Sequence, residues 1–228
     1  MTTIDFRIIP AGDSALTVEL PARIDRATSA RVIAMADAAR RRFGPGIRDA
    51  VVGYHTLTVY FDPLTLDTGW LEEQMGEIAG DAETAAVSAG VTIEVPVCYG
   101  GELGPDLPGV AAAAGLSEEE VVTLHTAAEY HVFVVGFVPG FAYMGPVDER
   151  LAIPRRDNPR TRVPAGSVAI AAGQTGVYPM ETPGGWHLIG RTTVRPFDEA
   201  RQEPVLFRPG DRVHFRSISR DHFDSIAG

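Results

Sequence analysis

The 228-residue sequence contains no lysine, because all 20 of its basic residues are arginine. This absence excludes every chemistry that needs a lysine amine on this chain, including a Schiff base, a phosphate-loop lysine and covalent biotin. The chain also has a single cysteine, Cys98. One thiol forms no intrachain disulfide, and without Cys or His neighbours at ligand spacing it anchors no structural zinc site. We therefore expect a reducing compartment and no metal.

Long apolar segments are missing as well. No run of 18 apolar residues occurs in the sequence, and residues 1–20 lack a basic start followed by an apolar core. We therefore expect a cytoplasmic protein without a membrane partner. The 30 acidic residues outnumber the arginines and give a net charge of −10. This balance disfavours nucleic acid, since phosphate contacts need clustered cations.

The charges are distributed unevenly along the chain. Residues 1–50 hold eight arginines and six acids, residues 51–149 hold sixteen acids and no arginine, and residues 150–228 hold twelve arginines and eight acids. The cation-free middle segment is a solvated acidic surface, or it docks on a basic partner protein, or it pairs with the arginine-rich third segment.

The first ninety residues predict a small α+β domain of the ferredoxin-like kind, with the order ββαββα. The patterns predict strands at 6–9, 15–20, 50–52 and 56–61, a helix at 26–43, and a helix from 70 that continues weakly to 89.

A new alternating strand at 91–95 predicts the domain boundary, so we expect domains at 1–90 and 91–228. A short helix to Ala114 follows, and then Ser117 and Glu120 form a capping box that opens a helix to about Ala128. From Gly136 onward, Gly and Pro recur between short apolar stretches. This spacing predicts a β-barrel or sandwich with long functional loops.

Three clusters contain the candidate site residues. The first is the loop 136–145, in which three glycines and one proline separate three aromatic residues. Such a loop suits a flat ligand or a partner, or its aromatic side chains plug a barrel end. Its candidate binding residues are Gly136, Phe137, Pro139, Gly140, Phe141 and Tyr143.

The second cluster, 154–167, has four arginines within eight residues and ends at Ser167. Such a loop suits bidentate recognition of a carboxylate or phosphate, or its arginines pair with the acidic middle segment. The third cluster, 172–192, offers an amide, a phenol and a guanidinium from Gln174, Tyr178 and Arg191.

None of the six histidines has a metal-ligand partner at helical or hairpin spacing. His125 lies on the capped helix, from which it reaches the loop 136–145 as an acid or base or else packs in the core. The familiar nucleophile and phosphate-binding motifs are absent.

Residues 99–107, 136–145, 154–167 and 174–191 together resemble the allophanate hydrolase subunit 1 family, also called the 5-oxoprolinase B subunit family. The resemblance is close over 95–215 and loose over 1–90. The family includes an inhibitor of a sporulation histidine kinase, and its paired subunits correspond to the carboxyltransferase domain of urea amidolyase. The resemblance implies an N-terminal α+β domain and a C-terminal cyclophilin-like β-barrel.

The resemblance also implies a component of an ATP-dependent amide or lactam hydrolase. The first expectation is 5-oxoprolinase, in which the chain works with a homologous allophanate hydrolase subunit 2, the C subunit, and with a separate A subunit. The resemblance also implies that the complex binds ATP, not necessarily through this chain. The alternatives are an allophanate hydrolase or urea amidolyase component and a non-enzymatic kinase inhibitor. As catalytic candidates we take His125, Arg160, Gln174 and Tyr178. Arg155, Ser167 and Arg191 join the loop 136–145 as substrate-binding candidates.

Overall fold

The computed structural model describes residues 6–81 and 90–227 and divides the chain into two compact units, 1–89 and 90–228. The predicted boundary, between residues 90 and 91, lies one residue after the boundary in the structure. Val18 lies in the core of the first unit and Val95 in the core of the second. The predicted weak continuation of a helix to residue 89 lies outside the described residues.

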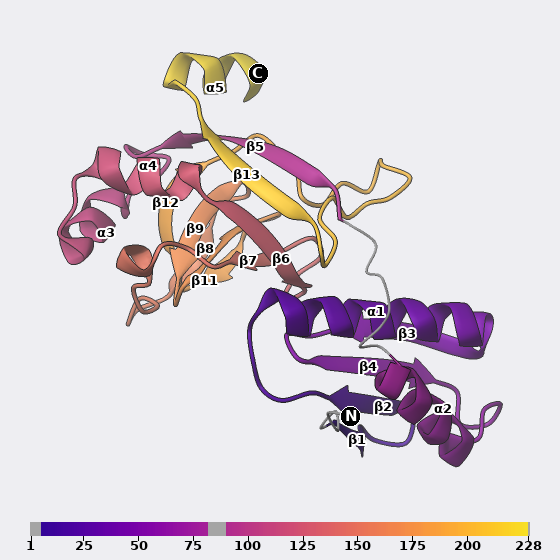
Figure 1. Ribbon diagram of the computed structural model, residues 1–228. Coiled ribbons are helices and arrows are strands. Elements are labelled where there is room, and N and C mark those ends of the chain that lie inside the picture. Colours follow the sequence, from indigo (N-terminus) through magenta and orange to yellow (C-terminus); the bar gives the residue numbers. More distant parts are fainter. Residues whose placement is uncertain (1–5, 82–89, 228) are drawn as a thin grey trace. The chain divides into compact units, whose positions relative to one another are not determined.

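The first unit has the predicted ββαββα order (Figure 1). Its elements are β1 (Arg7–Pro10), β2 (Ala15–Glu19), α1 (Arg26–Phe43), β3 (Ile47–Val52), β4 (Thr56–Phe61) and α2 (Thr68–Asp81), with a 3₁₀ turn at Gly44–Gly46. The antiparallel sheet has the order β1-β2-β4-β3, so β4 lies between the two strands that α1 connects. This is the split β-α-β arrangement, and the prediction is confirmed.

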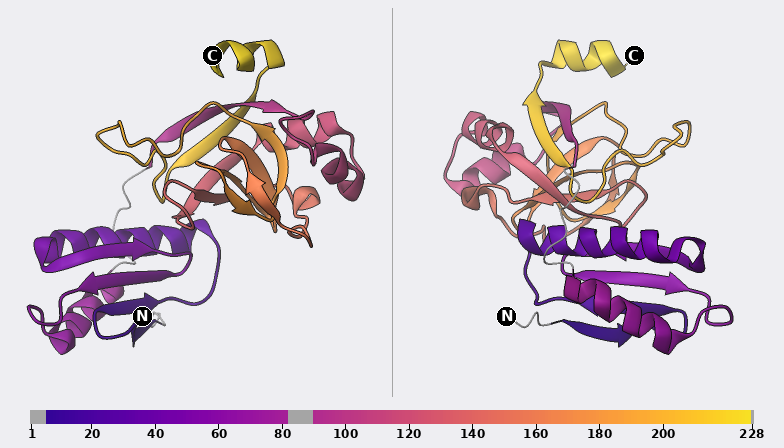
Figure 2. Two further views of the ribbon diagram at one scale, coloured as in Figure 1. Left: turned by 180° about the vertical axis from the view of Figure 1, so that it is seen from behind. Right: turned by 45° about the vertical axis from the view of Figure 1, so that its right-hand side comes forward.

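The second unit is built around a closed barrel of seven strands in the order β10-β7-β6-β13-β5-β12-β9. Its helices and strands are β5 (Thr92–Tyr99), α3 (Leu107–Ala114), α4 (Glu118–Ala127), β6 (Glu129–Val135), β7 (Ala142–Gly145), β8 (Arg160–Val163), β9 (Ser167–Ala171), β10 (Gln174–Val177), β11 (Thr182–Gly184), β12 (His187–Arg191), β13 (Arg212–Ser217) and α5 (Arg220–Ala227), with a 3₁₀ turn at Glu149–Leu151. β8 and β11 form a separate two-stranded sheet. The segment between β12 and β13 projects from the barrel, and α5 follows the end of β13 (Figure 2). The predicted barrel is therefore confirmed.

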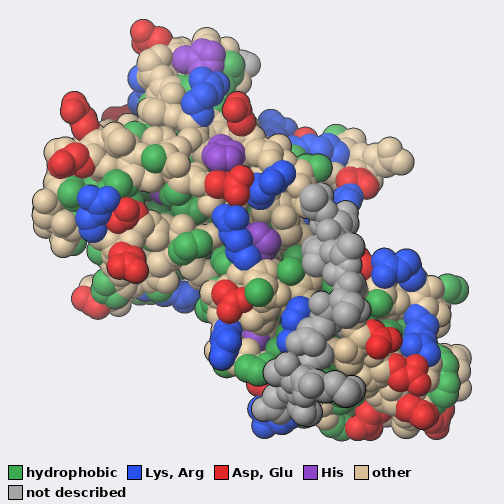
Figure 3. Space-filling view, viewed as in Figure 1, with side chains coloured by type: hydrophobic (Ala, Val, Ile, Leu, Met, Phe, Trp, Pro, Cys, Tyr) green, Lys and Arg blue, Asp and Glu red, His purple; other side chains and the backbone are tan. Residues whose placement is uncertain are grey.

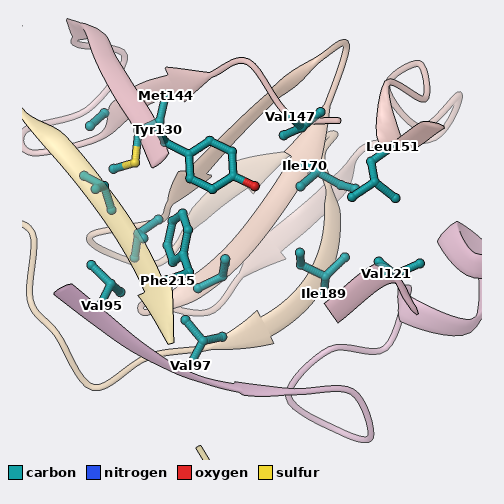
Figure 4. Close-up of a cluster of buried hydrophobic side chains, with 14 of the residues drawn as sticks. Val95, Val97, Val121, Tyr130, Met144, Val147, Leu151, Ile170, Ile189 and Phe215 are labelled. Atoms are coloured by element: carbon teal, nitrogen blue, oxygen red, sulfur yellow. The ribbon is translucent and has the colours of Figure 1, made fainter. Parts of the chain in front are cut away.

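The barrel interior is filled by apolar side chains from every strand, which Figure 4 shows converging around Tyr130 and Phe215. Successive strand residues point to opposite faces. On β9, Val168 and Ile170 therefore lie in this interior, whereas Ala169 and Ala171 belong to a second apolar cluster on the outer face. The outer cluster also contains Tyr178 and Trp186, together with Phe141 from the loop 136–145 and Val163 from the loop 154–167, which we call the arginine loop.

His125 is fully buried in this unit, and both of its ring nitrogens are hydrogen-bonded. Thr175 Oγ1 donates to the Ala169 carbonyl, so it accepts from His125 Nε2, 2.8 Å away. His125 Nδ1 therefore accepts from the Tyr99 hydroxyl at 2.7 Å. Burial lowers the pKa of His125 to about 3, which keeps the imidazole neutral. The structure thus places His125 in the core as a packing residue and not as an acid or base at the loop 136–145.

We predict that His125 makes the fold sensitive to acid. Its pKa is about 3 when folded and near 6.5 when unfolded. Between these values only the unfolded chain binds the proton, so stability falls by about 1.4 kcal/mol for each pH unit of acidification. Urea unfolding of the protein and of His125→Gln between pH 7 and pH 4 measures this slope. His125→Gln should lose this loss of stability on acidification, whereas the control His222→Gln, at an exposed site, should keep it. A wild-type slope that His125→Gln leaves unchanged contradicts the assignment.

Candidate functional site

The carboxylate of Asp106 binds two arginines of the loop 154–167. Arg160 donates two hydrogen bonds to it, both at 2.8 Å, and Arg156 donates a third at 2.9 Å. The backbone N–H of Leu188 donates a fourth at 2.7 Å. The backbone adds two further bonds, from Asp106 N to the Leu188 carbonyl and from Arg156 N to the Gly185 carbonyl. The carboxylate therefore ties the start of α3 to the arginine loop and to β12.

Burial favours the neutral form of Asp106, but the hydrogen bonds from Arg160 and Leu188 and the two arginine charges outweigh it and lower its pKa. The carboxylate is therefore ionised at neutral pH. Two guanidinium groups share one negative charge, so the cluster keeps an excess positive charge. Arg160 is thus held in a structural ion pair, which argues against its predicted catalytic role. Asp106 was not among the predicted site residues, although it lies in the segment 99–107 that carries the family resemblance.

Aromatic rings cover the outer face of the barrel beside this ion cluster. Phe141 contacts Tyr143, Tyr178 and Trp186 edge-to-face, with ring centroids 4.9, 5.2 and 5.5 Å away. A Cβ atom at Gly184 would collide with the Tyr178 hydroxyl, so glycine is needed where β11 passes this ring. Edge-to-face packing fixes the rings relative to one another. Phe141 is therefore packed into the apolar cluster on the outer face of the barrel.

Arg155 lies close enough to the hydroxyls of Tyr143 and Tyr178 for its charge to act on both. Burial raises the pKa of each tyrosine, and Arg155 opposes the increase. Both phenols therefore stay protonated at neutral pH and can donate hydrogen bonds. Arg155 itself is exposed and has no hydrogen bond or ion pair among the described residues. We call Phe141, Tyr143, Arg155, Tyr178 and Trp186 the aromatic–arginine cluster.

Ser167 and Arg191 lie on neighbouring strands next to this cluster. They are directly opposite each other in the β9–β12 register, and Tyr178 donates its backbone N–H to the Ser167 carbonyl from the other side. Arg191 in turn lies opposite Cys98 of β5. Tyr178, Ser167 and Arg191 thus form one row across the outer face, so the structure brings together three of the predicted site residues.

The loop 136–145 exposes one large aromatic side chain. Phe137 is 63 % exposed and has a positive φ of 74°, which is strained for a residue with a side chain. Gly136 and Pro139 flank it. Gly140 also has positive φ, and a Cβ atom there would meet the backbone of Pro196. The segment after β12 therefore fixes the base of the loop while Phe137 points outward.

Gln174 and Tyr178 lie at different points along one strand. Gln174 begins β10, whereas Tyr178 follows the end of that strand. Four residues of strand span about 13 Å, which sets the separation of the two backbones. The Gln174 backbone instead lies beside Gly145. The grouping of Gln174 with Tyr178 and Arg160 therefore stays a prediction, with Gln174 separated from Tyr178 along the strand and next to the end of the loop 136–145.

The acidic middle segment pairs in several places with arginines of the flanking segments. Besides Asp106, Glu129 lies 3.9 Å from Arg212 and 3.5 Å from His214. Figure 3 shows acidic, arginine and histidine side chains side by side over the face where Figure 1 draws β6 and β13. Pairing with the third segment, one of the three interpretations of the middle segment, thus occurs at these residues.

Within residues 6–81 and 90–227, no group of three His, Cys, Asp or Glu side chains suits a metal ion. In the same ranges, no helix has the length and apolar character needed to cross a membrane.

The family described as carboxyltransferase domain, subdomain C and D, matches residues 6–207. The chain therefore belongs to this family, and the resemblance seen in the sequence is confirmed.

Two relatives within the family are, by name, B subunits of 5-oxoprolinase. The protein from Bacillus subtilis (strain 168) is 40 % identical over 235 residues, which cover 97 % of this chain and 96 % of the relative. The protein from Escherichia coli O157:H7 is 44 % identical over 212 residues, which cover 90 % and 92 %. A putative urea carboxylase from Emericella nidulans is 25 % identical over 55 % of this chain and 11 % of its own length.

Solved structures share the fold. A protein designated TTHA0988 superposes with a TM-score of 0.80 at 38 % identity, over 90 % of this chain and 40 % of that chain. This chain thus spans well under half of TTHA0988. The Kluyveromyces lactis urea amidolyase superposes with a TM-score of 0.77 at 19 % identity, over 97 % of this chain and 15 % of that chain. At this identity the likeness shows the fold alone.

We predict that Asp106→Asn destabilises the second unit. The neutral amide leaves Arg156 and Arg160 without their counter-charge, and breaking such a pair costs about 2–4 kcal/mol when the arginines are partly exposed. Urea unfolding at pH 7 measures this loss. The control is Asp148→Asn, which breaks an exposed pair with Arg150 and should cost much less stability. Equal losses in the two variants contradict the proposed role of Asp106.

Proposed function

We propose that the chain is the B component of an ATP-dependent 5-oxoprolinase that converts 5-oxoproline to glutamate. The observation that supports this proposal best is the nearly full-length match to relatives of that name, at 40 % and 44 % identity. The proposed complex also contains a homologous C component and a separate A component, and it binds ATP. ATP hydrolysis would supply the driving force for opening the lactam, in which water adds to the carbonyl carbon and the ring nitrogen takes a proton.

The chemistry of the described residues fits a part in binding and orienting such a substrate. Residues 150–195 contain seven arginines and two acids in a chain whose net charge is −10. A local positive field attracts a small carboxylate. Tyr143, which is half-buried and protonated, is a donor suited to an amide oxygen. With His125 in the core and Arg160 bound to Asp106, we assign the remaining catalytic groups to the other components of the complex.

We further propose that Phe137 contacts the C component. An exposed aromatic side chain held in a strained backbone conformation is typical of a residue that a partner covers. The TTHA0988 structure supports a larger assembly, since this chain matches 40 % of that polypeptide. Exposed Pro139 and half-buried Val138 extend the apolar surface around Phe137.

We predict that 5-oxoproline turnover needs all three components together with ATP. Co-expression with the C component should give co-elution on size exclusion, and adding the A component and ATP should release glutamate. Omitting any one of the three should reduce the rate to background. Full turnover by this chain alone, or no association with the C component at micromolar concentration, would overturn the proposal. The second result would favour the kinase-inhibitor alternative.

We also predict that Phe137→Ala weakens the complex with the C component at least tenfold, since buried interface aromatics commonly contribute more than about 1 kcal/mol. Calorimetric titration of one protein into the other measures the dissociation constant. Leu64→Ala is the control, because Leu64 is also exposed but lies in the first unit. An unchanged dissociation constant for Phe137→Ala places the interface elsewhere.

A component of a urea-processing carboxylase is the second candidate. The partial match to the putative urea carboxylase favours it. Because this chain has no lysine, biotin would have to be attached to another protein. Carboxyl transfer from a biotinylated carrier to urea, without glutamate release from 5-oxoproline, would select this function over the first.

A further inference from the structure

Two buried polar atoms on neighbouring strands have no hydrogen-bond partner. They are Ser167 Oγ and Arg191 Nε, and neither finds a donor or acceptor within the described parts of the chain. Ser167 is 1 % exposed. Directly opposed residues on antiparallel strands have Cβ atoms about 5 Å apart. The Ser167 and Arg191 side chains therefore leave the sheet side by side on the same face.

Packing does not explain the serine. The next residues on the same face of β9 are Ala169 and Ala171, and both lie in the outer apolar cluster. An alanine at position 167 would continue that pattern. A buried hydroxyl without a partner costs roughly 1–3 kcal/mol. A ligand that satisfies the hydroxyl explains why the position is polar.

The charge of Arg191 is also uncompensated. The side chain forms no ion pair with an acid of the described residues, and it lies against Gly166, where a Cβ atom would be 3.4 Å from its Cγ. Arg191 is partly exposed as a residue, although its Nε is buried, and Ser167 is buried. Arg155, whose charge acts on the neighbouring Tyr178, adds a second cation without an ion-pair partner in the described ranges.

We propose that Ser167 and Arg191 form a subsite that binds the carboxylate of a small-molecule ligand. Arg191 donates through Nε–H and one terminal N–H in the fork geometry that matches a carboxylate, and the Ser167 hydroxyl donates to the same group. Tyr178, next in the row, borders the subsite. This inference rests on the proposed function in one respect, namely that the ligand is a lactam carboxylate such as 5-oxoproline.

The test compares two ligands that differ only in the carboxylate. Binding of 5-oxoproline and of 2-pyrrolidinone to the full chain is measured by NMR titration, and the KM of the assembled complex for 5-oxoproline is measured in parallel. Arg191→Gln should weaken binding of 5-oxoproline about tenfold to a hundredfold and Ser167→Ala about threefold to tenfold, because charge-assisted hydrogen bonds exceed neutral ones. The loss of affinity for 5-oxoproline in Arg191→Lys should lie between the losses in these two variants. 2-Pyrrolidinone should bind all variants equally.

The controls are Arg195→Gln and Ser217→Ala, which change exposed residues of the same types and should leave both ligands unaffected. Thermal melting without ligand checks folding, and Ser167→Ala should melt at or slightly above the wild-type temperature because it removes an unpaired hydroxyl. Parallel losses for both ligands would show a packing effect and overturn the subsite. Unchanged binding and an unchanged KM would show that Ser167 and Arg191 bind only water, and this result would also overturn the subsite.

The two proposals fail differently. If the complex releases glutamate with an unchanged KM in both variants, the subsite is wrong and the proposed function stands. If the complex does not turn over 5-oxoproline but the chain binds glutamate or succinate in a manner that Arg191→Gln abolishes, the function is wrong and the carboxylate subsite stands.

Discussion

The ion cluster at Asp106 is the interaction on which the candidate site depends. One carboxylate receives hydrogen bonds from residues 50, 54 and 82 positions further along the chain. The β8–β11 pairing and the bond from Arg156 N to the Gly185 carbonyl also hold the arginine loop beside β12, and the carboxylate adds the contact that joins both to the start of α3. Because Arg156 and Arg160 are fixed there, Arg155 is left facing the phenols of Tyr143 and Tyr178.

Because successive strand residues point to opposite faces, the residues that stabilise the barrel and those of the candidate site lie on different faces of the same strands. Residues that point inward, such as Val168 and Ile170, form the apolar interior. Residues that point outward, such as Ser167 and Tyr178, form the candidate site. His125 belongs to the inward group because α4 inserts it against Thr175 and Tyr99. The same helix therefore contributes to the stability of the barrel and offers no titrating group to a ligand at neutral pH.

Local sequence patterns predicted the elements well because their signals are local. The Ser117–Glu120 capping box is present, with both of its hydrogen bonds, and opens α4 where expected. The helix 26–43 has the predicted bounds, since Gly44 supplies a positive φ after Phe43. The candidate site was predicted in part. Tyr178, Ser167 and Arg191 do converge, but a linear pattern contains no measure of how far apart Gln174 and Tyr178 lie once the strand is extended.

The sequence by itself determined the α+β class, the two units, the excess of arginine after residue 150 and the absence of lysine chemistry. Periodicity, caps and turn residues act over a few positions, and family motifs are read directly from the order of residues. Only the tertiary structure decided which arginines are free to bind a ligand and whether His125 titrates. Those properties depend on burial and on partners such as Asp106 and Thr175, which lie 50 positions away along the chain. Pairing and desolvation over such separations are fixed by the closure of the barrel, and no local pattern encodes them.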